Sequence, residues 1–248
     1  MAESGRLKVA LCCPALPAGD IIQTMKRLCG LFLCSSICTL LLTSAVFAAP
    51  ALTVGQTMKL NVPQLKGKIS LEQSLSERRS QRDFSADDLG WNEVSQLLWA
   101  GQGITDSTWG FRTAPSAGAL FPITLYVCRA DGIYEYIPQG HQVKMIAAED
   151  RRLALSQASL AQAFVAQAPV CIVIASNIKK VRPKYGGRSD RYVYIEAGHV
   201  AENILLQATT MGLAAVPVGA FWDDIARRVL ALPEDQDPLY IVPVGYPK

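Results

Sequence analysis

Three arginines lie within five residues of one another, in the segment Arg78-Arg79-Ser80-Gln81-Arg82. A guanidinium group is a planar fork of five donors that matches phosphate oxygens, and the Ser80 hydroxyl adds a further donor beside the forks. We therefore predict that the segment binds one phosphate monoester. The alternative is a solvated basic helix end, where cations meet the negative end of the helix dipole.

Two later segments consist almost entirely of small residues and stand at the ends of apolar runs. Small side chains leave backbone N–H and C=O groups open to a flat ligand, and such groups in an apolar pocket can read a heteroaromatic ring. Each segment alone is also typical of an ordinary tight turn. The residues are Pro115, Ser116, Ala117 and Gly118 in the second segment, and Pro217, Val218, Gly219 and Ala220 in the third.

Further along the chain, Glu196, His199 and Asn203 are spaced so that they share one face of a helix. They form either a polar seam beside a ligand or a set of hydrogen-bonding residues that packs the helix. The sequence leaves both interpretations open.

These residues must be positioned by a mixture of helices and strands. Apolar periodicity predicts helices over 70–80, 91–100, 151–167, 190–211 and 223–230. Alternating or continuous apolar runs predict strands over 123–128, 133–137, 143–146, 170–175 and 239–244, with a loop over 105–118. Asp131-Gly132 is a hairpin signal. Because hairpins join antiparallel strands, the predicted class is α+β, with helices packed on a mostly antiparallel sheet.

The first 48 residues are predicted to be a leader. Residues 25–48 contain a short cationic start, an apolar run and a small-residue exit after Ala48, as in a secretory signal peptide. Residues 1–24 are interpreted as preceding a true start at Met25. The expected location is therefore exported, in the periplasm, with no stable membrane insertion after cleavage; an uncleaved anchor is the alternative. Residues 49–68 are predicted as an extended arm and 69–248 as a single domain.

The composition argues against several classes of function. Residues 1–48 hold four of the 24 Lys and Arg and two of the 21 Asp and Glu, so the remaining chain carries 20 cations against 19 anions. This balance indicates no nucleic-acid partner. Only Cys128 and Cys171 lie beyond the leader, as two buried thiols or one disulfide, and with two histidines no metal site is expected.

Taken together and in order, the motifs resemble the FMN-dependent nitroreductase superfamily, and more narrowly its SagB/ThcOx branch of azoline dehydrogenases. The resemblance extends from about Leu71 to Gly245. The segments that carry it are SERRSQRDF, LLWAGQGIT, RTAPSAGALFPITLYV, KYGGRSDRYVYIEAGHVAENILLQA, VPVGAF and YIVPVGYP.

The resemblance implies a nitroreductase-like fold with helices on both faces of the sheet, an intertwined homodimer and FMN at its interface. Arg78, Arg79, Ser80 and Arg82 match the motif for the FMN phosphate and ribityl chain. The second segment matches a loop on one side of the isoalloxazine, and the third matches the loop near its N5 atom.

Lys184 and Tyr185 match the pair to which this branch assigns proton removal from the substrate; the alternative is a charged surface loop. The expected function is hydride transfer through flavin N5, to or from a small molecule or a peptide heterocycle. The alternative is an exported module that binds a flavin or an anion without catalysis. The azole substrate itself is not transferred, because those dehydrogenases work inside cells with a cyclodehydratase partner.

Overall fold

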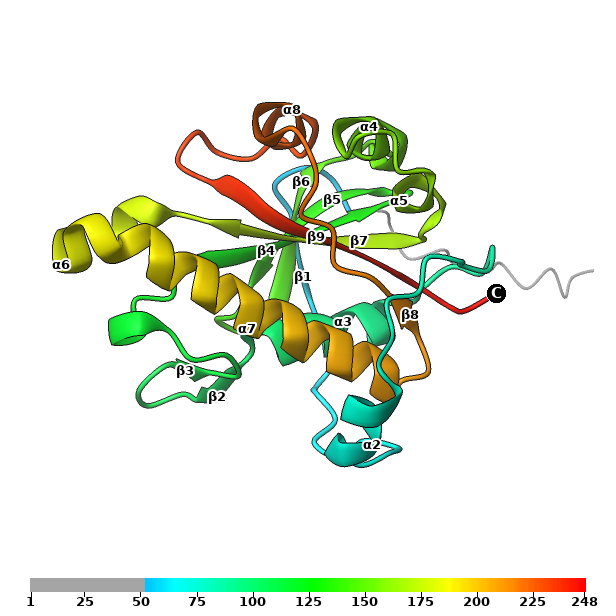
Figure 1. Cartoon of the computed structure of the whole chain (residues 1–248), viewed down its shortest axis with the longest axis horizontal. Helices are drawn as coiled ribbons and strands as arrows, with labels where there is room; N and C mark the ends of the chain where they lie inside the picture. Colours follow the sequence, from blue (N-terminus) through cyan, green and yellow to red (C-terminus); the bar gives the residue numbers. More distant parts are fainter. Residues whose placement is uncertain (1–51) are drawn as a thin grey trace, which may run out of the picture. The chain divides into compact units, whose positions relative to one another are not determined.

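The computed structural model describes residues 52–248 (Figure 1). The predicted start and signal peptide, residues 1–48, lie outside the described residues. A seven-stranded sheet crosses this domain, and every neighbouring pair of strands in it is antiparallel, as predicted. In spatial order the strands are β1 (Thr57–Lys59), β6 (Gln142–Ala147), β5 (Gly132–Ile137), β4 (Ile123–Arg129), β7 (Val170–Ser176), β9 (Asp237–Gly245) and β8 (Ala214–Ala215).

Helices cover both faces of the sheet, which confirms the predicted layers (Figure 1). One face carries α2 (Leu71–Glu77), α3 (Trp91–Gln102) and the long α7 (Ser189–Thr210). The other carries α4 (Arg152–Ala158), α5 (Ala163–Gln167) and α8 (Asp223–Val229). Because strand side chains alternate between faces, the sheet contributes residues to two separate apolar clusters, one under each set of helices.

The predicted central strand is β7, whose seven residues are all buried between β4 and β9. Such a strand needs apolar residues on both faces, which explains the continuous apolar run at 170–175. The hairpin between β4 and β5 also forms as predicted. Gly132 is required in it, because a Cβ atom there would lie 2.3 Å from the Ala147 carbonyl oxygen.

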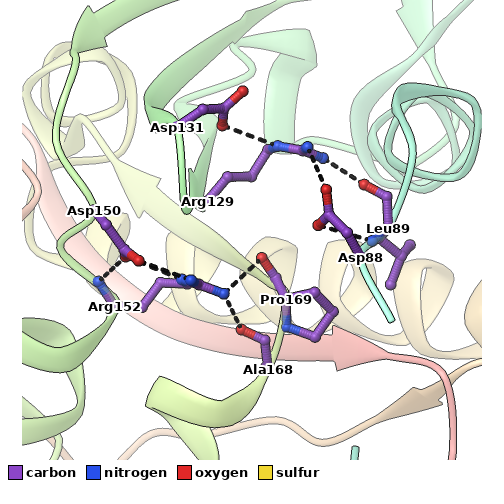
Figure 2. A network of polar contacts seen from close by, with 8 residues as sticks. All are labelled: Asp88, Leu89, Arg129, Asp131, Asp150, Arg152, Ala168 and Pro169. Carbon is purple, nitrogen blue, oxygen red and sulfur yellow. Dashed lines mark hydrogen bonds and ion pairs between the residues drawn. The ribbon is translucent and has the colours of Figure 1, made fainter. Parts of the chain in front are cut away.

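Two arginines, the buried Arg129 and the half-buried Arg152, fix loops to the ends of strands (Figure 2). Arg129 pairs with Asp88 at 3.2 Å and Asp131 at 3.1 Å, and donates to the Leu89 carbonyl at 2.6 Å. Arg152 pairs with Asp150 at 2.7 Å and donates to the carbonyls of residues 168 and 169. Each guanidinium is matched by a carboxylate and by carbonyl groups, as burial of a charge demands.

The helix predicted over 151–167 is wrong in its middle, where the chain forms two short helices instead of one. Leu160 and Ala161 have φ values of 56° and 57°, in the left-handed region. The Ser159 hydroxyl donates to the Leu155 carbonyl, and the Gln162 side chain donates to the Ser159 carbonyl. These side-chain bonds compete with helix continuation.

The helix predicted over 70–80 ends early, at Glu77, so the arginine cluster is not part of it. The backbone of Gln81 instead donates to the Ala215 carbonyl at 3.0 Å, and Ser80 forms a parallel bridge with Ala215. Pairing with a distant strand therefore replaces the last helical turn. Arg78 is the C-cap of α2, and Arg79 donates to the Ser76 carbonyl of its last turn, so the alternative of a solvated basic helix end stays open for these two residues.

Local pairing also changes two stretches predicted as irregular. The loop predicted over 105–118 contains a small hairpin, β2 (Ile104–Asp106) with β3 (Phe111–Arg112), and a 3-10 turn at Ala117–Ala119. The predicted arm contributes β1, which pairs with β6 at the sheet edge. The strands β1, β2 and β3 are each too short to show an alternation of apolar and polar residues in the sequence.

Candidate functional site

The arginine cluster and the third segment lie side by side. The Ser80–Ala215 bridge brings the cluster to a residue two positions before the third segment. Val218 in turn exchanges two backbone hydrogen bonds with Ile241 of β9, at 2.7 and 3.0 Å. The structure therefore places Arg78, Arg79, Ser80 and Arg82 next to the segment Pro217 to Ala220.

The guanidinium groups of the cluster are exposed and largely free to bind an anion. Arg78 lies 3.7 Å from Glu202 of α7, and Arg79 donates only to backbone carbonyls of its own turn. Arg82 stacks over the Phe164 ring at 5.6 Å and has no ion pair among residues 52–248. This contrasts with the buried Arg129 and the half-buried Arg152, whose charges are balanced by carboxylates.

A turn that the sequence did not indicate borders the third segment. The Gln162 side-chain amide donates to the Ala220 carbonyl at 3.1 Å, and the Trp222 N–H donates to the Ala158 carbonyl at 2.9 Å. The break between α4 and α5 therefore lies at the candidate site. The uninterrupted helical periodicity of 151–167 hid it.

The second segment lies against Lys184 and Tyr185. Gly118 has a φ of 63°, and a Cβ atom there would lie 2.6 Å from Lys184 Nζ and 2.8 Å from the Tyr185 hydroxyl. Both side chains come from α6 (Arg182–Tyr185), a single turn just before α7. The Tyr185 ring packs edge-on to Tyr192, with centroids 4.8 Å apart. Residues predicted from two separate motifs therefore form one contact.

Behind the second segment lies a buried carboxyl group. Glu196 is 2% exposed, and the Ser116 hydroxyl donates to its Oε2 atom at 2.5 Å. Burial raises the pKa of Glu196 to about 7, against the opposing effects of the Ser116 hydrogen bond and the charge of Arg112. Its Oε1 atom has no hydrogen-bond partner within residues 52–248.

The three polar residues predicted to share a face of α7 separate in the structure. Asn203 donates to the Thr113 carbonyl at 3.3 Å, on the same side as the Glu196 contact. His199 is exposed. Two of the three therefore hold the chain around the second segment, and the third points to solvent.

The site residues thus form two groups on different sides of α7. Arg78 contacts Glu202, whereas Ser116 contacts Glu196, six residues earlier. Six residues at 3.6 per turn leave these contacts about 120° apart around the helix axis. Within residues 52–248 no hydrogen bond, ion pair or aromatic contact joins the second segment to the cluster or to the third segment.

Other features of the described chain contribute no chemistry at these two groups. Cys128 and Cys171 are free, buried and opposite each other in β4 and β7, and burial raises the pKa of Cys128 to about 12. Residues 52–248 contain no group of three His, Cys, Asp or Glu side chains arranged for a metal. In the same range, no helix is both long and apolar enough to span a bilayer. A hollow of about 870 Å³ lies between the arm, α2, α3 and α7, and none of the four cluster residues lines it.

Comparisons with known proteins agree on one family. A sequence model described as the nitroreductase family matches residues 75–246. A provisionally named nitroreductase from Methanocaldococcus jannaschii is 41% identical over 198 residues, covering 77% of this chain and 98% of the relative.

Solved structures of similar fold include a provisionally named nitroreductase from Ralstonia eutropha, 30% identical, with a TM-score of 0.72 over 80% of this chain and 93% of that one. The NADPH:FMN oxidoreductase of Vibrio harveyi shares the fold at 19% identity, with a TM-score of 0.55 over 72% of this chain and 69% of that one.

Proposed function

The chain belongs to the nitroreductase family of FMN-dependent oxidoreductases, and from this premise we propose that it holds FMN between two copies of itself and transfers electrons to or from a small molecule or a peptide heterocycle. The observation that carries the proposal is the Ser80–Ala215 bridge. It sets the arginine cluster beside a segment of small residues in which Gly219 and Ala220 are exposed.

The residues present fit FMN. Arg79 and Arg82 are exposed donors for a phosphate, Arg78 is half-buried beside Glu202, and Arg82 has no carboxylate partner within 52–248. The third segment would hold the edge of the ring system, and Pro115 to Gly118 the side opposite. When bound, FMN supplies two-electron transfer at its N5 atom.

We propose that Lys184 and Tyr185 handle the proton that accompanies this transfer, as in the SagB/ThcOx branch. The contact of both side chains with Gly118 supports the assignment, because it sets them beside the segment proposed to hold the ring. A base within hydrogen-bond reach of the reacting atom accelerates proton removal. Lys184 is exposed and therefore accessible to a substrate.

We propose that the protein is a homodimer, and the separation of the two groups around α7 supports this proposal. The exposed side of α7 carries two large apolar side chains, Tyr194 at 60% and Ile195 at 50% exposure, among the polar residues Arg191, His199 and Glu202. If this face packs on its equivalent in a second copy, the second segment of one copy approaches the arginine cluster of the other. Each FMN would then be held by both chains.

We also propose export through the signal peptide at 25–48, with the mature domain in the periplasm and the cofactor acquired after transport. This rests on the sequence pattern of the leader alone. Fractionation of cells carrying the gene, with and without residues 25–48, tests it. Retention of the full-length chain in the cytoplasm would contradict it.

Purification of the protein tests the proposed function directly. We expect a yellow protein that dithionite bleaches and that a quinone or a nitroaromatic acceptor reoxidises with turnover. A colourless protein that shows no calorimetric affinity for added FMN would contradict the proposal. Colour without turnover would instead support the alternative, a module that binds flavin without catalysis.

A further inference from the structure

The turn at residues 116–121 is held closed by one side chain, Ser116. Its hydroxyl oxygen accepts from the Phe121 N–H at 2.9 Å, and its hydrogen is donated to Glu196 at 2.5 Å. The direction is fixed, because a hydroxyl has a single hydrogen. Both ends of the turn are therefore tied, through Ser116, to a buried carboxyl on α7.

This turn needs such a restraint because its backbone is strained. Ala119 and Phe121 have φ values of 54° and 46°, in the left-handed region that residues with a Cβ atom rarely adopt. Backbone of this kind persists only where surrounding contacts hold it. The hydrogen bonds of Ser116 to Phe121 and Glu196 supply that restraint.

The turn held in this way packs against the side chain of Lys184. Lys184 Nζ lies 2.6 Å from the position a Cβ of Gly118 would take and 5.6 Å from the centre of the Tyr185 ring. Among residues 52–248 it makes no hydrogen bond or ion pair. The position of this side chain therefore depends on the shape of the turn beneath it.

Glu196 faces the turn through Ser116, and the other groups that act on it are Arg112 and the backbone of Ile123. The charged group that acts on Glu196 is Arg112 of β3. Arg112 in turn lies near Tyr136 of β5. Tyr192 lies one turn before Glu196 in α7. Burial of a carboxyl with only one of its two oxygens bonded is costly for a group that serves packing alone.

We infer that Glu196 is a positioning residue of the proposed active site: its hydrogen bond to Ser116 fixes the 116–121 turn, and the turn fixes Lys184 and Tyr185. This inference rests on the proposed function, which gives the position of Lys184 its purpose. Glu196 contacts the second segment through the Ser116 hydroxyl and makes no hydrogen bond or ion pair with Lys184, so its effect on Lys184 passes through Ser116.

The test is a spectroscopic reading of the Lys184 amine in the full-length purified protein. Lysines are reductively methylated with ¹³C, and the signal of Lys184 is assigned by its loss in Lys184→Arg. We expect this signal to be distinct from those of exposed Lys179 and Lys180. In Glu196→Ala it should lose that distinct chemical shift. In Glu196→Gln it should keep it, because the amide oxygen still accepts from Ser116.

Ser116→Ala gives a second route to the same answer, since it removes one hydroxyl and is expected to fold if Glu196→Ala does not. A Lys184 signal unchanged in both alanine variants would overturn the inference, as would a Glu196→Gln signal displaced as far as that of Glu196→Ala. The reading needs no flavin. A protein that binds no FMN would therefore contradict the proposed function, whereas the Lys184 signal would still test the role of Glu196.

Discussion

The carboxyl of Glu196 makes folding stability depend on pH within the physiological range. Its pKa is about 7 in the folded chain, against an ordinary value of 4.5. Below pH 4.5 the carboxyl is protonated in both states, so its burial costs least. Between these values only the unfolded chain releases the proton, so stability falls as pH rises and the loss is complete above pH 7.

We predict that Glu196→Gln gains stability relative to the native protein between pH 5 and pH 8, by about 2–3 kcal/mol. Urea unfolding at both pH values measures the change. Glu234→Gln, an exposed carboxyl, serves as the control and should show no comparable gain. Parallel pH curves for Glu196→Gln and the native protein would show that the carboxyl does not titrate in this window.

Arg82 contributes to cofactor retention if the cluster binds phosphate. Arg82→Ala removes a charge-assisted contact of about 1.5–3 kcal/mol, so we predict a 10- to 100-fold weaker Kd for FMN. Fluorescence quenching of FMN on binding measures it. Arg228→Ala, an exposed arginine of α8, is the matched control; equal losses in the two variants would point to general electrostatics and not to a phosphate contact.

A substitution of Lys184 distinguishes FMN binding from substrate oxidation. Lys184→Ala should bind FMN with unchanged affinity, since the phosphate contacts lie on the other group, and should slow substrate oxidation by about 100-fold or more, as loss of a general base does. Stopped-flow absorbance of the flavin band measures the step. Oxidation at the native rate would remove Lys184 from the mechanism.

At the scale of elements, the 116–121 turn depends on a glycine. Gly118→Ala places a methyl group 2.6 Å from Lys184 Nζ at a φ of 63°. Gly110→Ala has a φ of 68° with nothing within 4 Å, so it carries the same backbone strain without the clash.

We predict that both variants lose about 1–2 kcal/mol of stability from the left-handed backbone. Only Gly118→Ala should also displace Lys184, and methyl-lysine spectra of the two variants separate these effects. A native Lys184 signal in Gly118→Ala would show that the turn and α6 are not in contact in solution.

Elements with long, strong patterns could be predicted from the sequence. The apolar stripe of α7 gave bounds of 190–211 against the observed Ser189–Thr210, and the run at 170–175 indicated the buried β7. The breaks between α4 and α5 and after Glu77 could not be found, because each depends on bonds formed only in the folded chain. For Leu160 and Ala161, which favour helices, local preference even points the wrong way.

In the candidate site, too, the residues with an unusual local pattern could be predicted and the contacts between them could not. Three arginines in five residues and two runs of small residues are unusual in composition, so they could be picked out directly. Which of them meet is a tertiary fact: the pairing of Ser80 with Ala215 joins residues 135 positions apart. Glu196 looked equally like a packing residue, because only the Ser116 contact distinguishes it.

At the scale of the whole molecule, the exposed face of α7 predicts coupling between assembly and cofactor binding. Ile195→Asp puts a charge at the centre of this face, and we expect it to yield monomers that have lost FMN. Light scattering after size exclusion and the flavin absorbance measure the two effects. Leu153→Asp, 66% exposed on α4, is the control for an added surface charge.

The two effects must appear together if the site is shared. A monomeric variant that keeps its flavin would show that one chain suffices. A dimer that persists in Ile195→Asp would place the interface elsewhere on the surface.

The position of β9 also determines when this domain can be completed. Residues 237–245 lie between β7 and β8, so the sheet stays open along β7 until they have been synthesised. A nascent polypeptide therefore cannot close its core until residues 237–245 have left the ribosome, and the uncovered edge of β7 is exposed to aggregation until then.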